Sequence, residues 1–403
     1  MLRFSGVCAL VAAVAAAVSL SASAAPPTPN DPGWPGQWGL RLAGFPELWA
    51  VAANEHPVIA TIDTGVDATF PDLRNAIVPG WDFVSNDAAP VDTAGHGTDV
   101  AIIIAANENN GYGLAGACPM CRIMPVRVTA DGDTPPALLA SGIRWAVDHG
   151  ARIISVSLAA PGPADPGEQA AVDYAAKHGA VVIAAAGNDG SASLHYPAAL
   201  MGVVSVAATD EHDNLYPWSA RGGWVDLAAP GCEYGDVMCG TSYTPPLVAA
   251  AVGLLTAADP DVTSTQAINA LRATAVHVSG IAGGRIDLAA AAAELGISTV
   301  QPASVTTPAG QQQAFVEGGT FARSFSTTLD LGGGPVSILL TRENARACTM
   351  SLRSLSAVYL TWRTTPSELD IGANVAKGRY ELMVSCSDPR RRTYSLFVNA
   401  RFS

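Results

Sequence analysis

Short runs of Val, Ile and Ala alternate with amphipathic segments through the first three hundred residues. Four of these runs have the length and the β-branched content of strands buried on both faces: 58–62, 151–158, 179–187 and 201–209. Two segments between them, 134–150 and 166–179, combine helical spacing of apolar positions with an early proline and a closing glycine. This alternation predicts a doubly wound α/β fold, in which helices flank a mostly parallel sheet.

The pattern changes near residue 298. Residues 298–312 have the Pro-, Thr- and Gln-rich composition of a linker. Beyond it, alternating apolar and polar runs separated by turn residues predict a small antiparallel domain of β-sandwich type at 313–403. The α/β domain is therefore expected at 26–297.

The N-terminus has the features of a secretory signal. Arg3 precedes an apolar run, and Ala22-Ser23-Ala24 gives the small-x-small pattern of a cleavage site. A membrane anchor is the alternative, but the apolar run is short for a span and is followed by small residues and prolines. We predict that residues 1–25 direct secretion to an extracellular or periplasmic location. No later segment is long and apolar enough to span a bilayer, so no membrane partner is expected.

Six cysteines follow the predicted signal, and an even number in an exported protein indicates disulfides. Pairing of neighbours predicts the bridges Cys118–Cys121, Cys232–Cys239 and Cys348–Cys386. A redox or zinc motif is the alternative for the first pair. Redox motifs of this spacing usually open a helix, whereas this one precedes the strand-like run 122–128, and no second pair is spaced for zinc. A structural bridge is favoured.

Composition excludes some partners. The chain of 403 residues is 49% apolar and 14% charged, which suits a large core. Its formal net charge of −13, with no basic stripe, argues against nucleic acid as a partner. The composition gives no sign of the oligomeric state.

Four polar residues stand at the ends of apolar elements, each in a short motif. They are Asp63 in DTGVD, His96 in GHGT, Asn188 in AAGN and Ser242 in GTS. A serine becomes a good nucleophile when a base takes its proton, and that base needs an acid to orient it. An amide can stabilise the oxyanion that forms. Asp67 is the alternative acid, though its loop position favours a turn role. Singly, these residues are ordinary turn, cap or core residues; together they predict an acyl-transfer site.

In this order and at these separations, the motifs resemble those of the subtilisin-like serine proteases, over residues 37–295. The resemblance implies a secreted serine endopeptidase that hydrolyses protein or peptide substrates through an acyl-enzyme, without a catalytic cofactor. It assigns Asp63, His96 and Ser242 to the triad and Asn188 to the oxyanion site.

The resemblance also implies sites for the substrate. An extended peptide would pair with the backbone of Ser157, Leu158 and Ala159. His195 would lie on the floor of the primary specificity pocket, where we expect it to shorten the pocket and disfavour large aromatic side chains.

A structural calcium ion is a further implication of the resemblance. Asp72 and Asn110 match the places of its ligands, and calcium prefers such oxygen donors. An ordinary turn is the alternative at both positions.

Several positions depart from the family's pattern. Ile102 follows GHGT where small residues are usual, Thr244 and Pro245 follow Tyr243 after the serine, and Ala250 replaces a helix glycine. Larger residues here would lie where the two catalytic helices pack and could shift His96 from Ser242. The departures leave two alternatives: a catalytically impaired binding protein on the same fold, or an adhesive or structural protein that acts through its β domain.

Overall fold

The structure is a computed structural model that describes residues 29–52, 55–232 and 238–297, together with the strands between 312 and 400. The predicted signal sequence and most of the predicted linker lie outside the described residues.

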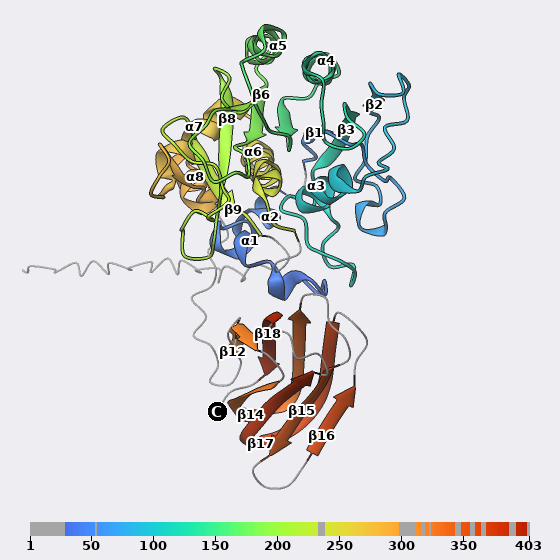
Figure 1. The fold of residues 1–403 in the computed structure, drawn as a ribbon, viewed down its shortest axis with the longest axis vertical. Coiled ribbons are helices and arrows are strands. Elements are labelled where there is room, and N and C mark those ends of the chain that lie inside the picture. The colour runs from blue at the N-terminus through green and yellow to red at the C-terminus, as the bar shows by residue number, and fades with distance from the viewer. Residues whose placement is uncertain are drawn as a thin grey trace, which may run out of the picture.

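A nine-stranded sheet forms the centre of the α/β part, with the strand order β10-β11-β9-β8-β6-β4-β1-β3-β2 (Figure 1). The strands are β1 (Val58–Asp63), β2 (Trp81–Asp82), β3 (Arg122–Arg127), β4 (Ile153–Val156), β6 (Val181–Ala185), β8 (Val203–Thr209), β9 (Leu227–Pro230), β10 (Val276–His277) and β11 (Gly284–Arg285). Neighbouring strands pair in parallel, except for β10 with β11. The predicted mostly parallel α/β sheet is confirmed.

Helices cover both faces of this sheet (Figure 1). The helices are α1 (Trp38–Leu42), α2 (Pro46–Ala52), α3 (His96–Ala105), α4 (Pro136–Asp148), α5 (Pro166–Lys177), α6 (Thr244–Ala258), α7 (Ser264–Thr274) and α8 (Leu288–Glu294). Side chains of a strand alternate between faces. Ile59 and Ile153 therefore share one core with α2, α3, α6, α7 and α8, while Ile62 and Ile154 share the other with α4 and α5.

Three short 3-10 helices and a small ribbon complete the α/β part. The 3-10 helices are η1 (Trp34–Gly36), η2 (Pro71–Leu73) and η3 (Thr241–Tyr243), and the ribbon pairs β5 (Ala160–Pro161) with β7 (His195–Tyr196).

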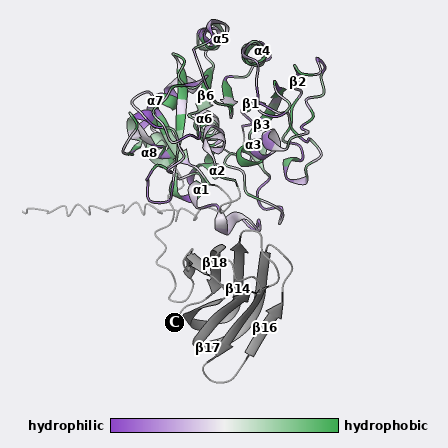
Figure 2. Cartoon of the chain, viewed as in Figure 1, coloured by the Kyte–Doolittle hydropathy of each residue, from purple (hydrophilic) through white to green (hydrophobic). Residues whose placement is uncertain are grey.

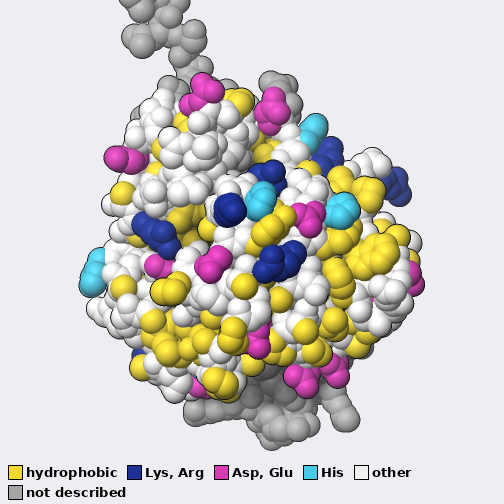
Figure 3. Space-filling model, turned by 90° about the horizontal axis from the view of Figure 1, so that it is seen from above, with side chains coloured by type: hydrophobic (Ala, Val, Ile, Leu, Met, Phe, Trp, Pro, Cys, Tyr) yellow, Lys and Arg dark blue, Asp and Glu magenta, His cyan; other side chains and the backbone are white. Residues whose placement is uncertain are grey.

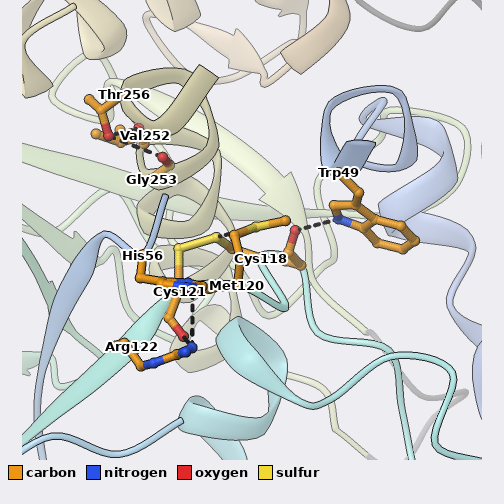
Figure 4. Close-up of a disulfide and its surroundings, with 10 residues drawn as sticks. Trp49, His56, Cys118, Met120, Cys121, Arg122, Val252, Gly253 and Thr256 are labelled. Atoms are coloured by element: carbon orange, nitrogen blue, oxygen red, sulfur yellow. Dashed lines mark hydrogen bonds between the residues drawn. A yellow bond between two sulfur atoms is a disulfide. The ribbon is translucent and has the colours of Figure 1, made fainter. Parts of the chain in front are cut away.

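Helix α6 runs through the core and is buried along nearly its whole length, as expected for a helix that is apolar all round. The disulfide Cys118–Cys121 lies against it (Figure 4). A Cβ on Gly253 would lie 2.8 Å from Cys121 Sγ, so the glycine allows the helix to approach the bridge. Both cysteines are fully buried, which suits a structural bridge.

The colouring by hydropathy follows this layering, since the hydrophobic colour is concentrated on the central strands (Figure 2). On the outer face over α4 and α5, basic and acidic side chains are intermixed (Figure 3). None of the helices among the described residues is long and apolar enough to cross a membrane.

The strands beyond residue 311 pair in an antiparallel sheet, as predicted from their alternating pattern. They are β12 (Gln312–Phe315), β13 (Gly319–Phe321), β14 (Ser324–Arg342), β15 (Cys348–Ser354), β16 (Tyr359–Arg363), β17 (Glu368–Cys386) and β18 (Arg392–Ala400). Cys348 and Cys386 are partners in the register of β15 and β17. Their side chains lie outside the described residues, so this bridge stays a prediction.

Candidate active site

The sheet brings Asp63 to His96. Asp63 is the last residue of the central strand β1 and is only 1% exposed, whereas His96 begins α3 and keeps about a third of its side chain exposed. Asp63 Oδ1 lies 2.7 Å from His96 Nδ1 and also accepts a hydrogen bond from the Thr64 amide. Because a carboxylate accepts from Nδ1, the proton of neutral His96 is held there, and Nε2 is left as the acceptor.

The glycines of GHGT explain how the histidine reaches this position. Gly95 has φ of 95°, a left-handed conformation that favours glycine. A Cβ on Gly97 would lie 2.2 Å from the Gly65 carbonyl oxygen, so only glycine allows α3 to start so close to the end of β1.

Asp92, which stands outside the four sequence motifs, ties the segments around Asp63 and His96 together. Its Oδ1 accepts from the Thr64 hydroxyl and from the amide of Gly95, and its Oδ2 accepts from the amide and the hydroxyl of Thr98. The Thr64 hydroxyl in turn accepts from the amide of Gly97. These bonds lower the pKa of Asp92 despite its burial. The carboxylate thus fixes the start of α3 against the residue that follows Asp63.

Three carboxylates set the basicity of His96. Burial lowers the pKa of His96, but the hydrogen bond and charge of Asp63 and the charges of Asp99 and Asp92 outweigh burial and raise it above its ordinary value. Asp99 lies one helical turn after His96 on α3. A raised pKa makes His96 a stronger base but keeps it protonated to higher pH.

Ser242 lies in η3, just before α6. The buried Ser157 hydroxyl donates to the Ser242 carbonyl at 2.6 Å, and the Tyr243 ring lies 6.1 Å from the His96 ring. Among the described residues, no hydrogen bond joins the Ser242 hydroxyl to His96; hydrogen bonds of this kind commonly tighten when substrate binds.

Asn188 follows β6, and Thr241 fixes its amide. The Thr241 amide donates to Asn188 Oδ1 at 2.8 Å, and its hydroxyl donates to the same oxygen at 2.9 Å. A backbone N–H can only donate, so Oδ1 must face Thr241 and Nδ2 must face away from it. The Thr241 hydroxyl also accepts from the Gly187 amide at 3.1 Å. Thr241 therefore fixes the orientation of the Asn188 amide group.

His195 lies beside the segment expected to bind substrate. It is buried, and its strand β7 pairs with β5, directly after Ser157, Leu158 and Ala159. A Cβ on Gly187 would lie 2.8 Å from the imidazole, so the ring packs flat on the residue before Asn188.

Asp72 and Asn110 are hydrogen-bonded to each other, and Asp31 binds the backbone of the same loop. Asn110 Nδ2 donates to Asp72 Oδ1 at 2.6 Å, and Asp31 accepts from the amides of Asn109 and Asn110. Burial and the charge of Asp31 raise the pKa of Asp72, although the bonds from Leu114 and Asn110 oppose this. Asp31 was missed because one aspartate among prolines carries no signal of its own. Among the described residues, no group of three or more His, Cys, Asp or Glu side chains is placed to hold a metal ion.

The positions that depart from the family's pattern are accommodated in the core. Ile102, Thr244 and Pro245 are all buried. The Thr244 hydroxyl donates to the Thr241 carbonyl at 2.9 Å, which links the first residue of α6 to η3.

Comparison with known proteins shows which family the chain resembles. A family model described as the subtilase family matches residues 54–314. Thermitase of Thermoactinomyces vulgaris is 40% identical over 264 residues, which cover 63% of this chain and 93% of thermitase. Subtilisin BL of Lederbergia lenta is 36% identical over 229 residues, or 55% of this chain and 83% of subtilisin BL. Among solved structures, a protease of Pseudoalteromonas arctica matches with a TM-score of 0.62 and 29% identity, covering 66% of this chain and 99% of that protease.

Proposed function

Since the chain belongs to the subtilase family and is a serine endopeptidase, we propose that Asp63, His96 and Ser242 form its catalytic triad. The observation that carries this proposal is the 2.7 Å contact between His96 Nδ1 and buried Asp63, made at the end of the central strand.

In the proposed mechanism, His96 Nε2 takes the hydroxyl proton of Ser242 while Ser242 Oγ attacks the carbonyl carbon of the scissile bond. Asp63 holds Nδ1–H and stabilises the imidazolium that forms. His96 then gives the proton to the leaving amine, and an acyl-enzyme remains. A water molecule, activated by His96 in the same way, releases the acid product. This cycle needs no cofactor.

Asn188 is proposed as the oxyanion donor. Its Nδ2 points away from Thr241, and it would donate to the carbonyl oxygen as negative charge develops there. Removal of one such donor costs about 10²–10³ in rate, a magnitude known for subtilisin itself rather than worked out from this structure.

The substrates proposed are proteins and peptides, bound as extended chains along Ser157, Leu158 and Ala159. The buried His195 ring packs against Gly187 and would close the floor of the primary specificity pocket, so substrates with a large aromatic side chain at the cleaved position should be poor. Cleavage of a peptide library by wild type and His195→Gly tests this: the variant should gain activity after Phe and Tyr. A wild-type preference for those residues would contradict the proposal.

A structural calcium ion would fit Asp31 and Asp72. Both carboxylates are buried, and the charge of Asp31 helps to raise the pKa of Asp72, so the pair would form the anionic, oxygen-rich setting that calcium prefers. The ion would stabilise the loop around Asn110 and would take no part in the chemistry.

The remaining features complete the proposal. Residues 26–297 would form the peptidase domain, 298–312 the linker and 313–403 an appended β domain. Secretion after removal of residues 1–25 agrees with the disulfides Cys118–Cys121 and Cys232–Cys239, since such bonds persist in oxidising compartments.

The triad is tested by the hydrolysis of casein and a peptide panel, with Ser242→Ala as the comparison. Loss of the nucleophile should lower kcat by about a millionfold. A loss of only about tenfold would be too small for a nucleophile and would favour a binding protein on the same fold.

A further inference from the structure

A second disulfide, Cys232–Cys239, lies close to Ser242 in the chain. Cys232 follows β9 after one glycine, and Cys239 stands three residues before Ser242. Cys232 is buried, while Cys239 is partly exposed. The bridge therefore closes the chain between the end of the sheet and the nucleophile.

Backbone hydrogen bonds next to the bridge attach both of its ends to the central sheet. The Gly240 amide donates to the Gly231 carbonyl at 3.0 Å, and the Gly231 amide donates to the Thr209 carbonyl at the end of β8. A Cβ on Gly231 would lie 2.6 Å from Ala208 Cβ, so this glycine packs directly on β8. Gly240 is thus held against the sheet by one hydrogen bond and by the adjacent covalent bridge.

The residues that follow Gly240 position the reacting groups. Thr241 donates twice to Asn188 Oδ1, and the Ser242 carbonyl accepts from Ser157. The buried helix α6 holds the chain again from Thr244 onward. A shift of Gly240 would therefore move both Ser242 and Thr241, because both lie between Gly240 and the point at which α6 fixes the chain.

We propose that the Cys232–Cys239 bridge is a positioning element of the active site and that its reduction lowers turnover. The inference rests on the proposed roles of Ser242 and Asn188. In the reduction, a thiolate of a dithiol attacks Cys239 Sγ, the S–S bond breaks, and Cys232 leaves as a thiolate. The second thiol then displaces Cys239, so that the dithiol becomes a cyclic disulfide and two electrons pass to the two cysteines.

The other bridge provides a matched control. Cys121 precedes β3, and Arg122 pairs with Val58 at the start of β1, five residues before Asp63. Cys121 is therefore six residues along the strands from the level of Asp63, or about 20 Å at about 3.3 Å per residue. The sulfur atoms of this bridge lie against Gly253 of α6 and Met120 (Figure 4), and the Cys118 amide donates to the Ile104 carbonyl near the far end of α3 from His96.

The test compares Cys232→Ser/Cys239→Ser with Cys118→Ser/Cys121→Ser. Opening the bridge beside Ser242 should lower kcat by about 10- to 100-fold, because a misplacement near 1 Å costs about this much. KM should change by less than about threefold, since the opened bridge loosens groups that act in the transition state. The control pair should lose thermal stability and keep its kcat at temperatures where it is folded.

A second measurement separates positioning from general destabilisation. In an Asn188→Ala background, opening the bridge should cost less than in wild type, because the donor positioned through Thr241 is already gone and only the shift of Ser242 remains. Equal losses in both backgrounds would overturn the proposal. If the double serine variant does not fold, wild type is titrated with dithiothreitol: kcat should fall as Cys232 and Cys239 become alkylatable, while near-ultraviolet circular dichroism persists.

The outcomes distinguish this inference from the function on which it rests. Unchanged kcat after the bridge is opened, with Ser242-dependent activity intact in wild type, overturns only the positioning role. Activity of the bridged enzyme that does not depend on Ser242 overturns the proposed triad and the inference with it.

Discussion

Thr241 offers a quantitative test of how the oxyanion donor is held. Replacing Thr241 by valine keeps the shape of the side chain and removes its hydroxyl. The Asn188 carbonyl oxygen then loses one of its two hydrogen bonds from Thr241, while the bond from the Thr241 amide at 2.8 Å remains. The buried Gly187 amide loses its acceptor.

The two losses have different sizes and different readouts. A net hydrogen bond contributes about 0.5–1.5 kcal/mol, so looser positioning of Asn188 should lower kcat by about 2- to 13-fold. An unpaired buried amide costs about 1–3 kcal/mol of unfolding free energy and should lower Tm by several degrees. The loss in kcat should stay below that of Asn188→Ala, about 10²–10³.

The assay is steady-state hydrolysis of a short peptide, with Tm measured in parallel. Thr241→Ser keeps the hydroxyl and serves as the control; its kcat should stay close to that of wild type. In an Asn188→Ala background, Thr241→Val should cost little further activity. If kcat of Thr241→Val equals that of wild type, Thr241 does not position Asn188. The same conclusion follows if Thr241→Val lowers kcat as much in the Asn188→Ala background as in wild type.

Two further predictions follow from charges in and near the site. His96 must be neutral to act as a base, so activity falls as pH drops through its raised pKa. Asp99→Asn removes one of the charges that raise this pKa and should move the acid limb of the pH profile of kcat/KM to lower pH. The control Asp261→Asn, in an exposed turn, should leave the acid limb unchanged. An acid limb that stays in place in Asp99→Asn would contradict the account. Calcium should raise Tm relative to chelator by a margin that Asp72→Asn removes; equal Tm values in wild type would argue for an ordinary turn.

The sheet and both helical faces could be predicted because their signals are local. Runs such as 179–187 and 201–209 are apolar on both faces, and β6 and β8 lie within them. The short helices α1 and α2 were missed, since prolines and glycines interrupt their apolar spacing and tertiary packing of Trp49 stabilises them instead.

The contact of Asp63 with His96 followed from motifs at the carboxyl end of a strand and the start of a helix. The residues that support this pair could not be found in the same way. Asp92 and Thr241 act through hydrogen bonds to residues 28 and 53 positions away, and such bonds leave no periodic or compositional trace.

The central claim is that one serine, activated by one histidine, carries the reaction. Its most direct test is labelling of the folded protein with a fluorophosphonate, followed by mass spectrometry of the labelled peptide. The account predicts one label per chain, located on Ser242 and abolished by His96→Ala at equal fold content. Labelling of another residue, or an unreactive Ser242 in folded wild type, would contradict it.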